Sequence, residues 1–124
     1  MKTEISKALI VDDEIDICFI LSGIFKNRNV STNYANSLAE AKVLMKKDPP
    51  SILFLDNHLP DGLGIQFLEY VKENYPETKV VMITAHDTPS DKRLALKNGA
   101  DYFIGKPFSI KTVYQTIDEL MARA

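Results

Sequence analysis

The chain has 124 residues, of which 45% are hydrophobic and 26% charged, values that are ordinary for a globular domain. The formal net charge is −2, so the composition gives no electrostatic case for nucleic-acid binding. A single cysteine excludes an internal disulfide, and no apolar run is long enough for a membrane span or a secretory signal. We therefore expect one domain over residues 1–124, located in the cytoplasm, without nucleic-acid or membrane contacts.

In chain order, short apolar and β-branched runs predict strands at residues 8–11, 52–55, 80–84 and 102–104, with a more ambiguous strand near residues 30–34. The intervening stretches carry apolar residues at helical spacing. The first predicted helix has the buried stripe Ile17, Ile20, Leu21, Ile24 and Phe25, and the second has Leu38, Ala41, Leu44 and Met45 after a capping box of Ser37 and Glu40. The third has Ile65, Leu68 and Val71 and ends before Pro76, and the fourth runs from about Ser90 to a stop signal at Asn98 and Gly99. The fifth begins at Ser109 and has the stripe Ile110, Val113, Ile117 and Leu120.

The strict alternation of strand and helix predicts the fold class. Five strand–helix units favour an α/β fold, with a doubly wound, five-stranded parallel sheet and helices on both faces. The nearly all-apolar strands agree, because parallel strands are buried on both sides. In open sheets of this kind, functional groups gather outside the carboxyl ends of the strands.

Polar or charged residues follow four of the five predicted strands. Asp12 and Asp13 follow the first strand, and Asp56 ends the third. Thr84 ends the fourth strand and Lys106 follows the fifth, whereas the second supplies no obvious group. Since parallel strands all end on one side of the sheet, we expect three carboxylates, a hydroxyl and an ammonium to converge there.

A cation is the expected solution to the repulsion between the three carboxylates, which cannot all stay ionised without a counter-charge. A hard divalent ion, Mg²⁺ or alternatively Mn²⁺, suits carboxylate and carbonyl oxygens. We expect direct ligation by Asp13 and Asp56, with Asp12 mainly holding metal-bound water. The backbone carbonyl of His58, two residues after Asp56, is a further expected ligand.

Phosphoryl transfer is the chemistry that these groups favour. A carboxylate beside a divalent cation can attack phosphorus to give an aspartyl phosphate, and Asp56 is the expected acceptor. Lys106 would pair with phosphoryl oxygens and the Thr84 hydroxyl would donate a hydrogen bond to another. Each residue alone also has a plain structural interpretation, such as strand packing by Thr84, but their joint spacing favours a site.

Four motifs give a family resemblance: LIVDDE, LFLDNHLPDG, VVMITAH and GADYFIGKPF, in this order along the whole chain. The sequence resembles the receiver domains of bacterial two-component response regulators, and is similar to the chemotaxis receiver. The resemblance implies a sheet of strand order 2-1-3-4-5. It also implies a phosphoacceptor signalling switch that is not a conventional enzyme and only assists its own phosphorylation and dephosphorylation.

The resemblance further implies roles for individual residues. Asp56 would be phosphorylated by a sensor histidine kinase or a histidine phosphotransfer protein, with Mg²⁺ required. The peptide bond between Lys106 and Pro107 would be cis. On phosphorylation, Thr84 would move toward the phosphoryl group and Phe103 would turn inward. This population shift would change the surface of the fourth helix, fifth strand and fifth helix.

Two histidines, His58 and His86, stand two residues after Asp56 and Thr84. In the family these positions influence how fast the phosphoryl group is lost. With the aspartates they would also suit a transition metal, so a metal-dependent hydrolase is an alternative, although it leaves Lys106 without a role. A dehalogenase-like phosphatase is excluded, because it needs an acid at the position of His58.

The loop after Asp56 departs modestly from the family pattern. Asp61 and Gly62 come early in this loop, where we interpret them as a turn, and Gly64 lies eight residues after Asp56. The departure affects the expected shape of the loop and leaves the expected chemistry unchanged.

The first predicted helix is apolar nearly all round. Beyond its core stripe, Ile15, Cys18, Phe19 and Ser22 form a second stripe, which we interpret as a docking face for the kinase or phosphotransfer helices. Two alternatives remain: another helix or a neighbouring chain covers this stripe, or the whole chain is a passive interaction module whose acidic edge has lost its activity.

The readout implied by the resemblance requires a further partner. This is either a downstream effector protein or a C-terminal output domain, and a phosphorylation-dependent homodimer is also expected. The chain stops at DELMARA, soon after the fifth predicted helix, and contains no effector domain. Both a stand-alone regulator and the receiver of a longer protein fit this sequence.

Overall fold

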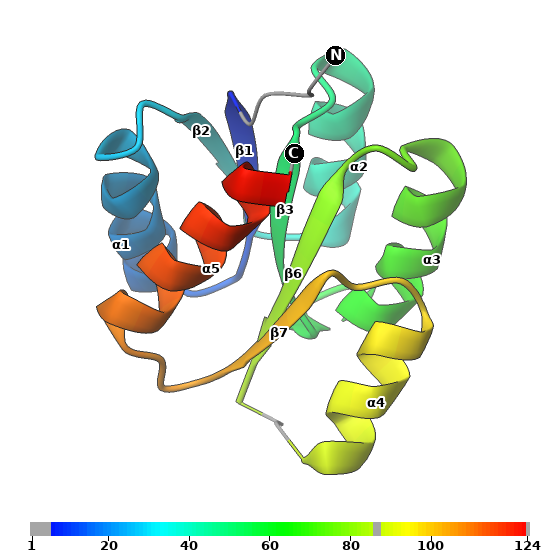
Figure 1. Ribbon diagram of the computed structural model, residues 1–124. Helices are drawn as coiled ribbons and strands as arrows, with labels where there is room; N and C mark the ends of the chain where they lie inside the picture. The colour runs from blue at the N-terminus through cyan, green and yellow to red at the C-terminus, as the bar shows by residue number, and fades with distance from the viewer. Residues whose placement is uncertain (1–5, 86–87, 124) are drawn as a thin grey trace.

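The computed structural model describes residues 6–85 and 88–123 and has a five-stranded parallel sheet between two layers of helices (Figure 1). The strands of this sheet are β1 (Lys7–Val11), β2 (Ser31–Ala35), β3 (Ile52–Asp56), β6 (Lys79–Thr84) and β7 (Tyr102–Gly105). Their order, β2-β1-β3-β6-β7, is the predicted order 2-1-3-4-5, because β4 and β5 form a separate hairpin. The predicted fold class is therefore confirmed.

The helices divide between the two faces of the sheet (Figure 1). The five helices are α1 (Ile15–Lys26), α2 (Leu38–Lys47), α3 (Gly64–Asn74), α4 (Pro89–Lys97) and α5 (Ile110–Arg123). The first face is covered by α1 and α5, and the second by α2, α3 and α4. Among the described residues, no helix combines the length and the apolar character needed to cross a membrane.

Side chains along the strands point alternately into two core layers. In β1, Ala8 and Ile10 belong to the layer with α1 and α5, whereas Leu9 and Val11 belong to the layer with α2, α3 and α4. All five residues of β3 are buried. The sheet is therefore packed from both sides, which fixes the places where its strands end.

The first and last helices are also joined at the surface. Arg28, in the turn after α1, forms two hydrogen bonds with Asp118 of α5, at 2.6 and 2.9 Å. Its guanidinium lies 4.5 Å from the ring centroid of Tyr114, also in α5. The layer of α1 and α5 thus combines a buried apolar contact with the hydrogen bonds and ring contact of Arg28 at its edge.

The buried stripe of α1 differs from the predicted one. The helix buries Cys18, Leu21, Ile24 and Phe25, whereas Ile20, predicted to be in the core, is 40% exposed. The prediction was wrong for Ile20 because apolar residues occur nearly all round this helix, so their spacing does not select one face. In α5, Ile110 was likewise predicted to face the core and is 56% exposed.

The predicted cap of α2 is confirmed in part. The Ser37 hydroxyl accepts a hydrogen bond from the backbone N–H of Glu40 at 3.2 Å. The Glu40 carboxylate, however, accepts from the backbone N–H of Asn36 at 2.8 Å, one residue before the position that a capping box uses. This contact orders the residue that directly precedes the cap.

The loop after Asp56 contains a small antiparallel hairpin that the sequence did not predict. It pairs β4 (His58–Leu59) with β5 (Gly62–Leu63) across a turn at Pro60 and Asp61. Gly62 has a φ of +150°, a backbone conformation that side-chain-bearing residues rarely adopt. The hairpin gives the residues that follow Asp56 a defined path.

Candidate functional site

Three carboxylates come together at the carboxyl ends of β1 and β3, as predicted. One ligand oxygen from each of Asp12, Asp13 and Asp56 lies within 4.8 Å of the other two. Asp12 and Asp56 are buried, because each continues a buried strand, whereas Asp13 is exposed in the turn before α1. The cluster therefore has two carboxylates beneath the surface and one beside solvent.

Lys106 supplies the positive charge next to this cluster. Its Nζ lies 2.9 Å from Asp12 Oδ2, 3.7 Å from Asp56 Oδ2 and 3.6 Å from a Glu14 carboxylate oxygen. Its backbone N–H donates to the carbonyl of Thr84 at 2.8 Å, which ties the end of β7 to the end of β6. The following peptide bond, to Pro107, is cis, as the family resemblance implies.

Burial controls the ionisation of these groups. It raises the pKa of Asp56 to about 6, and repulsion from Asp12 adds to this effect, while Lys106 opposes it. Burial also raises the pKa of Asp12, against the opposing influence of Lys106. For Lys106 itself burial lowers the pKa, but the interactions with Asp12, Asp56 and Glu14 together outweigh burial and the net pKa is raised. The site therefore favours a further positive charge, whether a proton or a cation.

The donor set fits a hard divalent cation. Asp12 Oδ2 is buried, and its contact among the described residues is the 2.9 Å ion pair with Lys106. The cluster has three carboxylates, and Lys106 supplies one ammonium beside two of them, so an excess of negative charge remains. Carboxylate oxygens in this number, with one side open to solvent at Asp13, suit Mg²⁺ or Mn²⁺.

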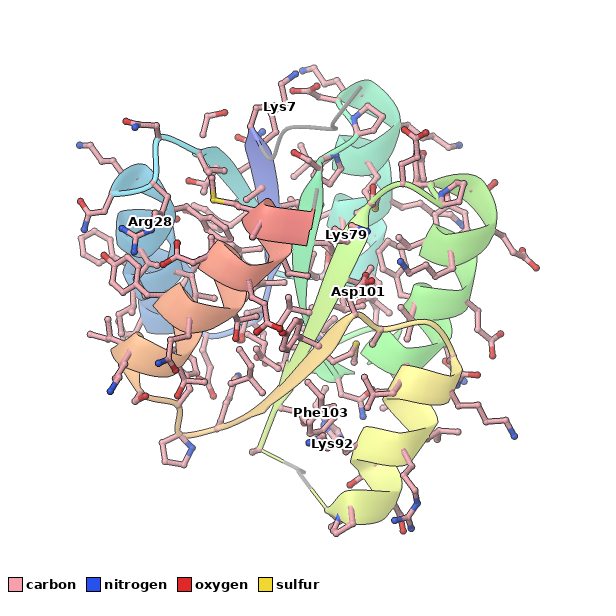
Figure 2. The ribbon with its side chains drawn as sticks, viewed as in Figure 1. Lys7, Arg28, Lys79, Lys92, Asp101 and Phe103 are labelled. Carbon is pink, nitrogen blue, oxygen red and sulfur yellow. The ribbon has the colours of Figure 1, made fainter. Side chains whose placement is uncertain are left out.

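Thr84 and Phe103 lie together beside the acidic cluster. Both line a small cavity between β6, β7 and α4, whose other walls include Asp91, Leu94 and Ala95 of α4. Thr84 is buried. Phe103 is half-buried on the side of the sheet that α4 covers (Figure 2). A movement of Thr84 toward the carboxylates would therefore change the packing under Phe103 and α4.

Two loop residues that the sequence analysis did not use as site residues shape the backbone next to Asp56. The Asn57 side chain accepts from the backbone N–H of Ile65 at 2.9 Å, and its carbonyl accepts from the N–H of Gly64 at 2.8 Å. A Cβ at Gly64 would meet the Asp56 carbonyl oxygen well inside 3.0 Å, a separation that real Cβ atoms essentially never show. Only glycine fits where α3 begins against the end of β3.

Asn36 is a further residue that the sequence analysis did not identify. It follows β2 directly, and its side-chain Nδ2 donates to the backbone carbonyl of Asp12 at 2.8 Å. The strand for which the sequence analysis found no obvious group thus contributes to the same edge. Its position at a strand end was the signal that could have identified it.

Asp61, interpreted from the sequence as part of a turn, makes a longer-range contact. Its two carboxylate oxygens accept from the backbone N–H groups of Leu38 and Ala39, at 2.8 and 2.9 Å, in the first turn of α2. These hydrogen bonds hold the pKa of Asp61 below its usual value. No local sequence signal links the Asp61 turn to α2.

The predicted docking stripe on α1 is only partly a surface. Ile15 is 56% and Phe19 80% exposed, and Ser22 is half-buried. Cys18 is buried, with its Sγ 3.5 Å from the Asp12 carbonyl, so its expected place on a partner-facing stripe is wrong. The helical period puts Cys18 in line with Leu21 and the core.

The two predicted rate-tuning histidines have different outcomes. His58 is an exposed residue in the hairpin, and its backbone N–H makes a hydrogen bond that lowers the pKa of Asp56. His86 lies outside the residues that the structure describes. The expected influence of both side chains on phosphoryl loss stays a prediction.

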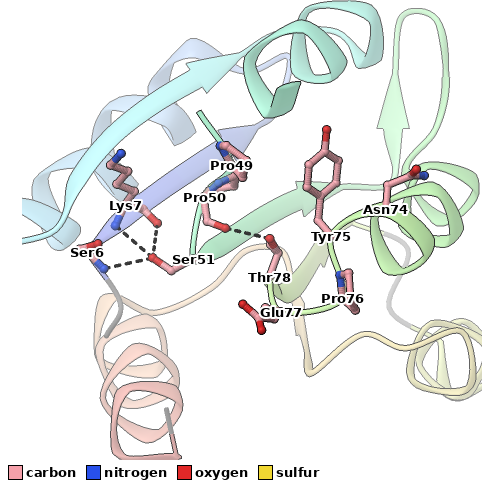
Figure 3. A pocket seen from close by; sticks show the side chains of 10 residues that line it. All are labelled: Ser6, Lys7, Pro49, Pro50, Ser51, Asn74, Tyr75, Pro76, Glu77 and Thr78. Atoms are coloured by element: carbon pink, nitrogen blue, oxygen red, sulfur yellow. Dashed lines mark hydrogen bonds between the residues drawn. The ribbon is translucent and has the colours of Figure 1, made fainter. Parts of the chain in front are cut away.

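The largest cavity described lies at the opposite end of the sheet (Figure 3). It measures about 500 Å³ and is lined by residues 6–7, 49–51 and 74–78, before the amino ends of β1, β3 and β6. Two of its hydroxyl groups, those of Ser51 and Thr78, already bond to the backbone. The chemistry is therefore concentrated at the acidic end.

Comparison with known proteins identifies the family. The family model for the response regulator receiver domain matches residues 8–118. The chain is 38% identical over 104 residues to the response regulator protein PilR of Pseudomonas aeruginosa, covering 84% of this chain and 23% of PilR. It is 36% identical over 103 residues to the nitrogen assimilation regulatory protein NtrX of Azorhizobium caulinodans, covering 82% of this chain and 23% of that protein.

Solved structures agree with this match. The crystal structure of the receiver domain of NtrX from Brucella abortus has a TM-score of 0.87 at 29% identity, covering 94% of this chain and 99% of that one. The solution structure of the beryllofluoride-activated NtrC4 receiver domain dimer has a TM-score of 0.88 at 34% identity, covering 94% and 97%. The chain spans less than a quarter of the two regulators, PilR and NtrX. Because the family model covers most of its length, the chain belongs to the response regulator receiver domain family of two-component signalling.

Proposed function

We propose that this chain is a phosphoacceptor switch in which Asp56 receives a phosphoryl group in a Mg²⁺-dependent reaction. The observation that carries the proposal is the convergence of Asp56 with two further carboxylates and the Lys106 ammonium at the ends of three strands. The donor would be a sensor histidine kinase or a histidine phosphotransfer protein. Such a switch would act in the cytoplasm, the usual place of response regulators.

Different residues of the chain would form the bond to phosphorus, hold the cation and pair with the phosphoryl oxygens. An Asp56 carboxylate oxygen would form a bond to phosphorus as the bond from phosphorus to the donor nitrogen breaks and the imidazole leaves with a proton. Asp12, Asp13, Asp56 and the His58 carbonyl would hold the cation, which when bound neutralises charge on the phosphoryl oxygens. Lys106, already 3.7 Å from Asp56, would pair with another of these oxygens.

The expected response connects Asp56 to the α4 side of the sheet. The Thr84 hydroxyl would donate to the phosphoryl group, and the cavity that Thr84 shares with Phe103 and α4 would repack as it moves. The surface of α4, β7 and α5 would then present itself to a downstream effector protein, an output domain or a second copy of the chain. The exposed Ile15 and Phe19 of α1 would contact the phosphodonor protein.

A small phosphodonor tests this proposal without the cognate kinase. The protein is incubated with acetyl phosphate, with and without Mg²⁺, and its mass is measured. We expect one added phosphoryl group with Mg²⁺ and none without it, and none in Asp56→Asn under either condition. Asp48→Asn is the matched control, because Asp48 is an exposed aspartate paired with Lys7 at the other end of the sheet; it should accept phosphate like wild type.

Two results would contradict the proposal. A folded wild-type protein that gains no phosphoryl group from acetyl phosphate or phosphoramidate with Mg²⁺ would favour a passive interaction module. Phosphorylation that persists in Asp56→Asn would show that the acceptor is another residue. The alternative of a metal-dependent hydrolase would require catalytic turnover of a substrate with Zn²⁺.

A further inference from the structure

We propose that residues 36–39, which lead into α2, form a brace that sets the spacing between the two loops of the cation site. The positioning residues are Asn36, within this segment, and Asp61, which binds to the segment from the hairpin after β3. One loop follows β1 and carries Asp12 and Asp13, and the other follows β3 and carries His58. The inference rests on the proposed function, because it assigns these residues to the cation site. We call residues 36–39 the α2 brace.

The first contact of the α2 brace reaches the loop after β1. Asn36 Nδ2 donates to the Asp12 carbonyl at 2.8 Å, in a partly buried position. The Asn36 backbone is itself held, because its N–H donates to the Glu40 carboxylate at 2.8 Å. The peptide unit between Asp12 and Asp13 is therefore fixed from outside its own strand, and with it the direction in which both carboxylates leave the backbone.

The second contact reaches the loop after β3. The Asp61 carboxylate accepts from both Leu38 and Ala39, whose N–H groups belong to the first turn of α2 and have no partner within the helix. The positive end of the helix dipole favours a carboxylate there. Asp61 lies in the turn of the hairpin whose first strand holds His58, so this contact fixes the His58 backbone relative to α2.

The two contacts matter together because the cation ligands come from both loops. Mg²⁺ requires nearly ideal octahedral geometry, with oxygen distances of about 2.0–2.1 Å, so small shifts between the loops weaken its binding. Gly62 is also close-packed against the start of α2, since a Cβ there would lie 3.0 Å from Leu38 Cδ1. The α2 brace thus links the Asp12 and Asp61 loops by hydrogen bonds at its two ends.

Mg²⁺ affinity, measured by calorimetry on the full chain, tests the α2 brace. We expect Asn36→Ala and Asp61→Ala each to weaken Mg²⁺ binding about tenfold, the lower end of effects seen for residues behind metal ligands. The matched controls are Asn74→Ala, which removes a side-chain amide bonded to a carbonyl of α3, and Asp101→Ala, which removes a carboxylate bonded to a backbone N–H of β6. Both are expected to bind Mg²⁺ within about twofold of wild type.

Hydrogen exchange in the metal-free protein provides a second measurement. In Asp61→Ala the amides of Leu38 and Ala39 should exchange faster, and in Asp61→Asn, which keeps one acceptor oxygen, part of the protection and part of the Mg²⁺ affinity should return. If Asp61→Ala does not fold, Asp61→Asn is compared with Asp101→Asn instead. Asp101 lies before β7, at the other end of the sheet from the acidic cluster (Figure 2).

The outcomes separate this inference from the proposed function. Folded Asn36→Ala and Asp61→Ala proteins that bind Mg²⁺ as tightly as wild type would overturn the α2 brace and leave the phosphoacceptor proposal intact. Equal weakening in Asn74→Ala and Asp101→Ala would also overturn it, because the loss would then follow general stability. A wild-type protein that binds no Mg²⁺ would overturn both proposals.

Discussion

The two ends of the sheet treat polar groups in opposite ways. At the amino end, the Ser51 hydroxyl accepts from the backbone N–H groups of Ser6 and Lys7 and lies 3.0 Å from the Lys7 carbonyl, and Thr78 donates to the Pro50 carbonyl at 2.8 Å (Figure 3). At the carboxyl end, three carboxylates lie together, and one ammonium, that of Lys106, pairs with the two buried ones, Asp12 and Asp56. Matched partners stabilise the first end, whereas the second keeps unmatched charge that a ligand can relieve.

The ion pairs of the two ends differ in the same sense. Lys7 and Asp48 meet at 2.6 Å with both side chains about half exposed, so water screens their charges. Lys106 and Asp12 meet at 2.9 Å with side chains 11% and 0% exposed, where each charge depends on the other. This difference indicates that the carboxyl end is arranged to bind a ligand, at some cost in the stability of the metal-free fold. The following substitutions test it.

The largest expected effect is steric and lies beneath the acidic end. Gly64→Ala should lower the free energy of unfolding by about 3 kcal/mol or more, because the new Cβ meets backbone atoms of Asp56 that cannot move aside. Gly23→Ala is the control, since a Cβ there meets nothing within 4 Å. In the interior of α1 this alanine should stabilise the protein by about 0.5–1 kcal/mol. Urea denaturation measures both, and equal effects would contradict the packing argument.

The next effect concerns the charge of Asp56. Because its pKa in the folded protein is about 6, above the ordinary 3.8, the folded state binds a proton more tightly than the unfolded chain. Metal-free wild type should therefore lose stability as pH rises from about 4 to about 6, by up to about 3 kcal/mol from Asp56. Asp56→Asn should lose less, because it keeps the raised pKa of only one of the two buried carboxyl groups, that of Asp12. The stability advantage of Asp56→Asn should be small at pH 4 and full at pH 7.

Urea denaturation at several pH values, with and without Mg²⁺, checks this expectation. Mg²⁺ should reduce the advantage of Asp56→Asn at pH 7, because the cation binds the folded wild type and compensates its buried charge. An advantage that is constant from pH 4 to pH 7 would mean that the ionisation of Asp56 does not limit the stability of the acidic end.

Two buried threonines at the opposite ends allow a direct comparison. Thr78→Val should lower the free energy of unfolding by about 1–2 kcal/mol, because it leaves the Pro50 carbonyl without its donor. Phosphorylation by acetyl phosphate should be unaffected. Thr84→Val keeps the shape of the side chain and should instead reduce the rate of phosphorylation, measured by mass spectrometry. The comparison would fail if Thr78→Val reduced that rate as strongly as Thr84→Val.

The smallest effect is expected at the exposed ion pair. Asp48→Asn should change the free energy of unfolding by less than about 0.5 kcal/mol, because Lys7 and Asp48 are exposed and screened. Adding salt should make the difference smaller still. A loss of several kcal/mol, measured by thermal unfolding, would show that the amino end also depends on charge.

The sheet and the acidic cluster could be predicted because both are indicated by short, continuous segments of the sequence. Each buried strand is a short apolar run, and the residue after it occupies the functional edge wherever the sheet is parallel. This reasoning placed Asp12, Asp13 and Asp56 together without any knowledge of distances. It extends to Asn36, which follows β2, but a single amide among carboxylates was not recognised as part of the site.

The contacts that could not be predicted join segments far apart in the chain. Asp61 and Leu38 are 23 residues apart, and an aspartate in a turn gives no local indication of which helix it caps. The prediction of which face of α1 is exposed was wrong for a different reason. Cys18 and Ile20 are both apolar in a helix that is apolar nearly all round, so only the packing against α5 and the sheet decides which one is buried.

The layer formed by α1 and α5 joins a helix that is synthesised early to one that is synthesised late. The apolar cluster that contains Ile10 and Phe25 is complete only when Val113, Ile117 and Leu120 of α5 have been synthesised. Among the described residues, the layer of α2, α3 and α4 contains none from α5, so it can close sooner. During translation one face of this sheet would therefore be packed before the other, and the emergence of α5 would complete the second face.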